Sequence, residues 1–257
     1  MSYRTVVFFV LSSGVVGSGF ADGDSSTLKA YDPAYKTLSV PNKILTLSLG
    51  NAWLKSGSAQ SLSLLPPFEN YYSAHQTYRS ALMGGLFLGI EYWKNPLLAL
   101  QLGMGGYVYS SVNVSGSVLQ FGMPQFSNFN YNYHIRSQRL VAEGKVLTTL
   151  QNWLHPYISG NVGMAANKAY GYRESPLASD NVPMLPFTNR SNPSFTYSVG
   201  AGFDLDISRS FRLGVGYQYD DLGKFLLGRS PAQSTNEVLN SQHLGSHEIK
   251  FQVTAVG

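Results

Sequence analysis

The stretch FTYSVGAGFDLDI, residues 195–207, alternates apolar residues with small or polar ones. Phe195 and Phe203 fall on one parity, whereas Gly200 and Asp204 fall on the other. Because successive side chains of a β-strand point to opposite faces, this period of two predicts a strand. Its apolar face must contact either a protein core or lipid, and the rest of the sequence has to decide between the two.

The composition is unusual for a protein in water. Charged residues make up 12% of the 257 residues, against roughly 25% in soluble domains. Cysteine is absent, which excludes disulfides and thiolate metal sites. The net charge is +4, and the basic residues are scattered singly, so we expect no nucleic-acid partner. No motif in the sequence predicts a cofactor.

The N-terminus has the order of segments that is typical of an export signal. Arg4 precedes an apolar run over residues 6–16, and Gly19 and Ala21 provide small residues before the polar sequence DGDSS. This order predicts a signal peptide that is cleaved after Ala21; a retained apolar strand or anchor helix is the alternative. The expected division is a signal peptide over 1–21, a periplasmic segment over 22–42 and a barrel over 43–257.

Eight segments alternate in the same way and predict eight strands. Most are long enough to cross a bilayer obliquely, which takes about 9–11 residues. The segments are 44–54, 81–93, 97–110, 133–148, 156–170, 195–207, 211–219 and 247–255.

The connections between these segments alternate in length. Three are the short sequences KNP, TLQNWLH and SRS, whereas the other four are long, polar and rich in Pro, Asn and Ser, which disfavour regular structure. Short turns at one end and long loops at the other are typical of transmembrane barrels.

Aromatic residues mark two levels along the segments, as expected for rings that settle at membrane interfaces. At the short-turn level we expect a girdle of Tyr92, Trp93, Trp153 and Tyr157. At the long-loop level we expect a girdle of Trp53, Tyr107, Tyr109, Tyr133, Tyr197 and Tyr219.

A soluble lipocalin-like barrel, or a β-sandwich, is the competing interpretation. Its outer face would need many Lys and Glu residues, which this chain lacks. The sequence from Gly50 to Trp53 also has one residue too many for the Gly-x-Trp signature of lipocalins. We therefore predict an all-β fold: an eight-stranded antiparallel up-and-down transmembrane β-barrel with short periplasmic turns and long extracellular loops.

Together, these features resemble the small outer-membrane barrels of the OmpA-like and opacity-protein class. The resemblance implies the outer membrane of a Gram-negative bacterium, contact with its lipid and lipopolysaccharide, and insertion by the barrel-assembly machinery. In one respect the sequence departs from this class. Such barrels usually finish on an aromatic residue, whereas this chain finishes FQVTAVG with Phe251 as the nearest aromatic.

Nine charged residues fall on the inward parity of the expected strands. Both signs are present, so we expect a neutralised and closed lumen with paired charges, because an unpaired buried charge is costly. Asp206 and Arg212 flank a tight turn and should face each other across neighbouring strands. The nine residues are Glu91, Arg139, Glu143, Lys145, Asp204, Asp206, Arg212, Glu248 and Lys250.

The candidates for a catalytic or metal role are His243, His247 and Glu248, with Ser241 and Ser246 nearby. No nucleophile elbow or His-Glu-x-x-His sequence is present, so we expect no enzyme and no metal site. The long loops are rich in Tyr and Asn, which suit adaptable contact surfaces. We expect a structural or surface-contact role, adhesin-like or antigen-like, toward host or environmental ligands. A small OmpW-like channel and a lipid hydrolase are the alternatives.

Overall fold

The structure is a computed structural model that describes residues 41–257 except residues 76, 184–185 and 242. The signal peptide predicted over 1–21 and nearly all of the segment predicted over 22–42 lie outside the described residues. Among the residues that the structure describes, no helix combines the length and the hydropathy needed to cross a membrane.

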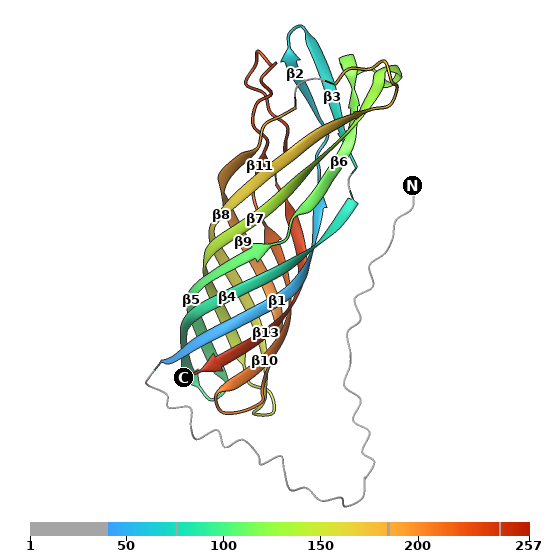
Figure 1. Ribbon diagram of the computed structural model, residues 1–257. Helices are drawn as coiled ribbons and strands as arrows, with labels where there is room; N and C mark the ends of the chain where they lie inside the picture. The colour runs from blue at the N-terminus through green and yellow to red at the C-terminus, as the bar shows by residue number, and fades with distance from the viewer. Residues whose placement is uncertain (1–40, 76, 184–185, 242) are drawn as a thin grey trace, which may run out of the picture. The chain divides into compact units, whose positions relative to one another are not determined.

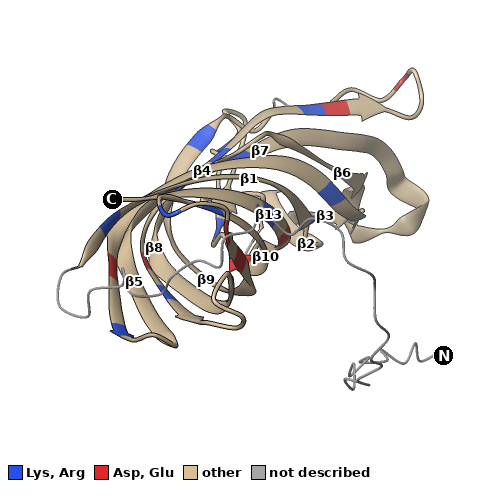
Figure 2. Ribbon diagram, turned by 90° about the horizontal axis from the view of Figure 1, so that it is seen from below, with Lys and Arg blue, Asp and Glu red and all other residues tan. Residues whose placement is uncertain are grey.

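Eight antiparallel strands form a closed ring (Figures 1 and 2). Each strand pairs with the next in the ring, and the first strand, β1, closes it by pairing with both β4 and β13. The eight-stranded barrel predicted from the sequence is therefore confirmed. The ring strands are β1 (Asn42–Ser56), β4 (Thr77–Asn95), β5 (Leu98–Tyr109), β7 (Ser127–Thr148), β8 (Leu154–Pro176), β9 (Arg190–Asp206), β10 (Phe211–Asp221) and β13 (Gly245–Val256).

The pairing register shows how the ring closes. Followed from Trp53 through β13, β10, β9, β8, β7, β5 and β4, the register returns to β1 at Lys43, ten residues earlier. For eight strands this stagger tilts the strands by about 40° and leaves an interior that side chains can fill.

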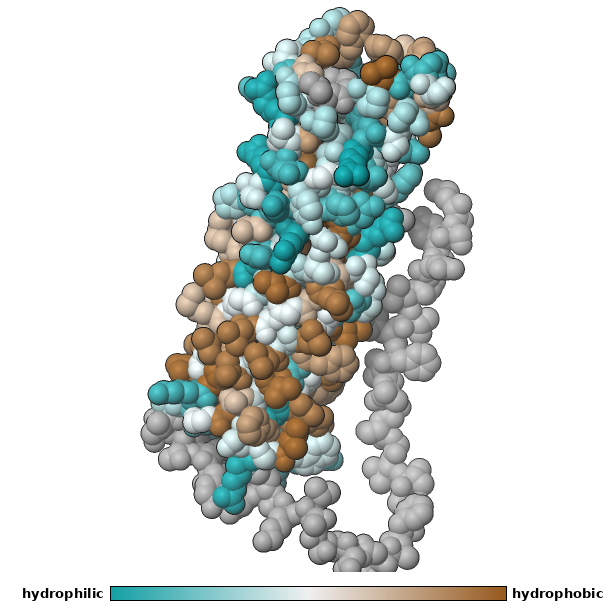
Figure 3. All heavy atoms as spheres, in the orientation of Figure 1, coloured by the Kyte–Doolittle hydropathy of each residue, from teal (hydrophilic) through white to brown (hydrophobic). Residues whose placement is uncertain are grey.

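The apolar parity faces outward. Leu49 is 66% exposed and Phe251 is 64% exposed, whereas their chain neighbours Ser48 and Lys250 are buried inside. On the face that it shows, Figure 3 has a belt of brown, apolar side chains across the lower part of the barrel. This is the reverse of a lipocalin, whose apolar side chains line the interior, so the belt has the surface that a lipid-facing wall requires.

The three short turns lie at one end of the barrel, as predicted. The long connections differ from the prediction, because they contain further strands instead of only irregular loops. The sheet continues outward in the order β7, β6 (Val112–Leu119), β3 (Phe68–Ala74) and β2 (Gln60–Leu65). The ends of β7 and β8 protrude beyond the ring and pair with each other, and the free edge of the β7 end pairs with β6, which the loop composition did not reveal.

We use the term head for this protruding part, which is uppermost in Figure 1. It comprises residues 57–75, 110–137 and 167–193, together with loop 4, which we define as residues 222–244 with its short strands β11 (Phe225–Leu226) and β12 (Asn240–Ser241). Two single 3-10 turns, η2 (Gln120–Gly122) and η3 (Pro124–Phe126), lie near its tip.

Strand β2 is the edge of the extended sheet, and loop 4 covers it. The amide of Ser63 donates to Oε2 of Glu237 at 2.5 Å, and Oγ1 of Thr235 donates to the carbonyl of Ser63 at 2.7 Å. Nε2 of Gln60 donates to the carbonyl of Asn240 at 2.7 Å. Side chains and loop backbone thus satisfy polar groups that an open edge leaves bare.

Candidate functional site

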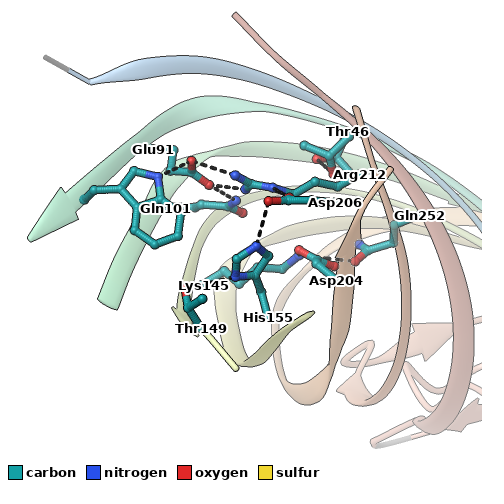
Figure 4. A network of polar contacts seen from close by, with 12 residues as sticks. Thr46, Glu91, Gln101, Lys145, Thr149, His155, Asp204, Asp206, Arg212 and Gln252 are labelled. Atoms are coloured by element: carbon teal, nitrogen blue, oxygen red, sulfur yellow. Dashed lines mark hydrogen bonds and ion pairs between the residues drawn. The ribbon is translucent and has the colours of Figure 1, made fainter. Parts of the chain in front are cut away.

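A polar network, here called the lower network, crosses the lumen near the short-turn end (Figure 4). The Arg212 guanidinium lies between two carboxylates: its Nε donates to Oδ1 of Asp206 at 2.7 Å, and its two terminal nitrogens donate to Glu91. Nε2 of His155 contacts the other oxygen of Asp206 at 2.9 Å, and Nδ1 of His155 contacts Oγ1 of Thr149 at 3.1 Å. The network therefore connects β4 to β8, β9 and β10.

The strand register brings these groups together. Asp206 and Arg212 are direct partners on β9 and β10, so the pair predicted from the sequence is present. Glu91 also accepts hydrogen bonds from Nε1 of Trp93 at 2.6 Å and from Nε2 of Gln101 at 2.8 Å. Buried charges need hydrogen-bond partners for all of their polar atoms, because an incompletely partnered ion pair lowers the stability of the fold.

The middle of the lumen is also filled with paired polar groups. Nζ of Lys145 donates to Oδ2 of Asp204 at 2.9 Å and to Oε1 of Gln252 at 3.3 Å. The same ammonium lies 3.9 Å from the ring centroid of Tyr157. Beside the lower network, where Thr254 is the register partner of Arg212, the hydroxyls of Thr46 and Thr254 are hydrogen-bonded at 2.8 Å.

Toward the head, Arg139 pairs with Asp220 at 2.5 Å and lies over the ring of Tyr107, 4.8 Å from its centroid. The Tyr107 hydroxyl donates to Glu143 at 2.5 Å. The carboxylate of Glu248 is fully buried, and neither of its oxygens has a hydrogen-bond partner among the described residues.

All nine charged residues assigned to the lumen lie on the inner face. Eight are buried, and Asp206 is half-buried as a residue with a side chain that is 4% exposed. The structure distributes eight of them over the three levels just described, with acidic and basic groups at each level, and Nζ of the ninth, Lys250, donates to Oε1 of Gln218 at 2.7 Å.

The expected aromatic girdles need correction. Five of the ten residues point into the barrel or the head and are buried: Trp93, Tyr107, Tyr109, Tyr133 and Tyr157. The prediction considered only their height, but each lies one residue away from an outward side chain, so the alternation of the strand turns it inward. The residues on the outer face are Tyr92 and Trp153 at the short-turn level, and Trp53, Tyr197 and Tyr219 at the other level.

The head has an aromatic core that the sequence analysis missed. The ring of Tyr131 stacks on Tyr133 and Tyr172, at centroid distances of 6.2 and 5.9 Å. Phe187 packs edge-on against Tyr172 at 4.9 Å. Burial raises the pKa of the Tyr72, Tyr131 and Tyr172 hydroxyls above the ordinary tyrosine range, because the charged form loses its hydration.

The parity of residues 127–137 could have revealed this core. Phe129, Tyr131, Tyr133 and Ile135 share the inward parity of Arg139, which extends the predicted strand backward from residue 133. The Pro and Asn residues of the surrounding sequence favoured a loop instead.

Loop 4 lies over the outer end of the lumen. Five of its apolar side chains are at most 1% exposed and belong to the core of the head: Leu222, Phe225, Leu227, Leu239 and Leu244. Nδ2 of Asn167, on β8, donates to the carbonyls of Leu222 and Lys224 at 2.7 and 2.9 Å, which fixes the start of the loop. The outer mouth is therefore covered by a packed apolar layer.

The residues considered for catalysis do not form one site. His247 faces outward and contacts the Tyr217 hydroxyl at 2.6 Å, whereas its neighbour Glu248 faces the lumen. His243 is exposed and contacts Oδ2 of Asp221 at 3.1 Å. Over the described part of the chain, no cluster of three His, Asp or Glu residues is arranged to hold a metal ion.

No protein-family model matches the sequence, and no curated protein matches it. Structural comparison finds partial likeness to Neisserial surface protein A, at 10% identity and a TM-score of 0.43 over 83% of this chain and 96% of that chain. The outer membrane protein OprG from Pseudomonas aeruginosa gives 15% identity and 0.42 over 83% and 96%. The outer membrane protease OmpT from Escherichia coli gives 12% and 0.38 over 88% and 98%. At these identities and TM-scores, no likeness assigns a function.

Proposed function

We propose that the protein is an exported outer-membrane barrel that acts as a surface-contact protein through its head and does not conduct solutes or catalyse a reaction. The observation that carries this proposal is an exposed aromatic cluster at the tip of the head, above a lumen that is closed by side chains. The outward apolar belt supports the location in a membrane.

The tip of the head presents apolar rings to the solvent. Phe68 is 58% exposed and lies edge-on to Phe121 at 5.4 Å, and Phe121 in turn contacts Phe126 at 5.7 Å. Tyr71 and Met123 are also exposed. Figure 3 shows brown side chains at this end of the molecule, well separated from the belt. A contiguous exposed apolar patch is typical of an interaction surface.

The lumen offers poor support for the channel alternative. An ion would have to pass the lower network, the pairs around Lys145 and Arg139, and then the apolar underside of loop 4. In a barrel of eight strands the side chains themselves occupy the interior.

Conductance and attachment together test the proposal. We expect the refolded full chain to give no steady current in planar bilayers, and vesicles carrying it to attach to epithelial monolayers or to abiotic surfaces. Replacing both Phe68 and Phe121 by Ser should abolish the attachment. Val182→Ser, which removes an apolar side chain that is 84% exposed elsewhere in the head, should not. A stable, ion-selective current would contradict the proposal in favour of the channel, and equal attachment of both variants would contradict the contact role.

Two further measurements test the remaining parts. Mass spectrometry of the membrane-extracted protein should show a chain that begins at Asp22, and an intact Met1 would contradict cleavage. A hydrolase is tested by His243→Ala, because His243 is the histidine paired with Asp221. If this variant removed an ester-hydrolysing or peptide-hydrolysing activity of the refolded chain, the non-enzymatic role would be wrong.

A further inference from the structure

The outward side chains of β7 and β8 change character at one height. Counted from the short-turn end, the paired outward residues are first apolar and then include Gln138 opposite Ala166. The next outward pair is Arg136 opposite Lys168, and both side chains are exposed. The apolar pairs below them are Val146 with Ile158, Ala142 with Val162 and Leu140 with Met164.

The Arg136–Lys168 pair is unusual because like charges directly opposite each other destabilise a sheet. No ion pair joins either residue to a carboxylate in the described part of the chain, in contrast to Arg139, Lys145 and Arg212 in the lumen. Lys168 lies 5.4 Å from the ring centroid of Tyr170, on the same face, and its partner on β9 is Ser191. An anion bound between the two cations would offset their repulsion.

A second part of the wall shows that this height is the upper border of the belt. On β1 and β4 the outward pairs run from Leu49 with Gly84, through Trp53 with Ser80, to Lys55 with Tyr78. The order is again apolar, then aromatic or polar, then cationic. Cations directly above an apolar belt lie at the level of the lipid head groups.

We infer that Arg136 and Lys168 bind a phosphate of the phosphorylated glycolipid that forms the outer leaflet. This inference rests on the outer-membrane location proposed above. The guanidinium of Arg136 can donate two parallel hydrogen bonds to one phosphate, and Lys168 adds a point charge from the other strand. The acyl chains of the same lipid then cover Leu140 and Met164, directly below the pair. The bound lipid thereby stabilises the barrel wall, because its phosphate offsets the repulsion between the two cations.

Binding of fluorescent lipopolysaccharide to the refolded full chain in phosphatidylcholine nanodiscs tests the inference. We expect Arg136→Gln/Lys168→Gln to bind about 30-fold more weakly than the unmodified protein, which corresponds to about 1 kcal/mol for each basic residue. Raising the salt concentration should reduce this difference. Lys43→Gln/Lys94→Gln removes two exposed cations from the opposite end of the barrel and should bind like the unmodified protein.

The urea concentration at which the protein unfolds is a second readout, and the double variant should shift it in opposite directions in the two lipids. In phosphatidylcholine alone, the Arg136→Gln/Lys168→Gln variant should unfold at a slightly higher urea concentration, because a repulsion has been removed. With lipopolysaccharide present it should unfold at a lower concentration than the unmodified protein. A loss of stability in both lipids would indicate a merely structural role and would overturn the inference.

The remaining outcomes distinguish a lipid phosphate from free phosphate, and failure of this inference from failure of the proposed function. Equal binding of enzymatically dephosphorylated lipopolysaccharide would overturn the inference, as would displacement by inorganic phosphate at matched ionic strength. Suppose that the chain inserts into bilayers and migrates differently in detergent gels before and after boiling, as a folded barrel does. If both double variants then bind lipopolysaccharide equally, only this inference fails. If the chain does not insert at all, the proposed function fails with it.

Discussion

The barrel and the head share the long strands β7 and β8, but the side chains that point inward are polar in the barrel and apolar in the head. On β7 within the barrel, Glu143 points inward and Leu140 points outward. On the same strand within the head, Tyr131 points inward and Arg136 points outward. The hydrogen-bonded ladder continues through the change without a break of strand.

This comparison separates what the backbone determines from what the solvent determines. The alternation of side chains is a property of any strand. Which set of residues is apolar depends on the medium outside: hydrocarbon requires apolar side chains on the outer wall, whereas water favours them in the core. A strand that passes from one medium into the other must exchange the two sets, and β7 does so between Ile135 and Leu140.

The largest expected effect concerns the polar interior of the barrel. Arg212→Ala leaves Glu91 and Asp206 buried without their shared cation, which should lower the free energy of unfolding by about 3–5 kcal/mol. Urea unfolding of the protein in phosphatidylcholine vesicles measures this change.

A triple variant provides the control for that measurement. Arg212→Met combined with Glu91→Gln and Asp206→Asn removes all three charges together and should cost much less, because no unpaired charge remains. If Arg212→Ala alone were as stable as the unmodified protein, the lower network would not hold the barrel together.

The next largest effect compares the two outer surfaces. Val215 faces outward in the apolar belt, so Val215→Arg should destabilise the barrel by about 2–4 kcal/mol in a bilayer. Asn113 faces outward on β6 in the head, and Asn113→Arg should cost about 0.5 kcal/mol or less. Equal costs in the same vesicle assay would mean that both surfaces contact the same medium.

The smallest effect is confined to the head and depends on pH. Its core tyrosines have a raised pKa in the folded state, so their contribution to stability is complete below the ordinary tyrosine pKa of about 10 and is lost as the pH rises above it. Near-ultraviolet circular dichroism should show the aromatic core of the head loosening above that pH. If these tyrosines ionised at the ordinary tyrosine pKa and the dichroism signal did not change, the head would not have a packed core.

The sequence was sufficient for the barrel because a barrel wall is a local pattern. Each segment such as 211–219 carries its own alternation, and the low number of charged residues indicated that the apolar face points outward. The Asp206–Arg212 pair was predictable because only a tight turn separates its members. Glu91, in contrast, joins Arg212 from a strand more than a hundred residues away, and only the stagger of the closed ring brings them together.

The head was less predictable because its strands depend on partners that are distant in the sequence. Strand β3 is held by β6, and β6 is held by the protruding end of β7, so none of them follows from composition alone. Loop 4 has two strands of only two residues, and its buried leucines look like isolated apolar residues in a polar stretch. The prediction of the aromatic girdles was wrong for five residues for a simpler reason: it took account of their height along the strand but not of the face to which they point.

In the membrane location proposed above, the cover that loop 4 places on strand β2 has a practical consequence. Proteins held in two dimensions meet repeatedly in the same orientation, and an uncovered sheet edge on each head would pair with the edge of the next copy. A peptide tag inserted near Thr235 would displace the contacts to Ser63 and expose that edge. A tag inserted at Gly122 lies in the turn region between β6 and β7 and leaves the cover in place. The second position is therefore the one for displaying a label on living cells without linking the molecules into chains.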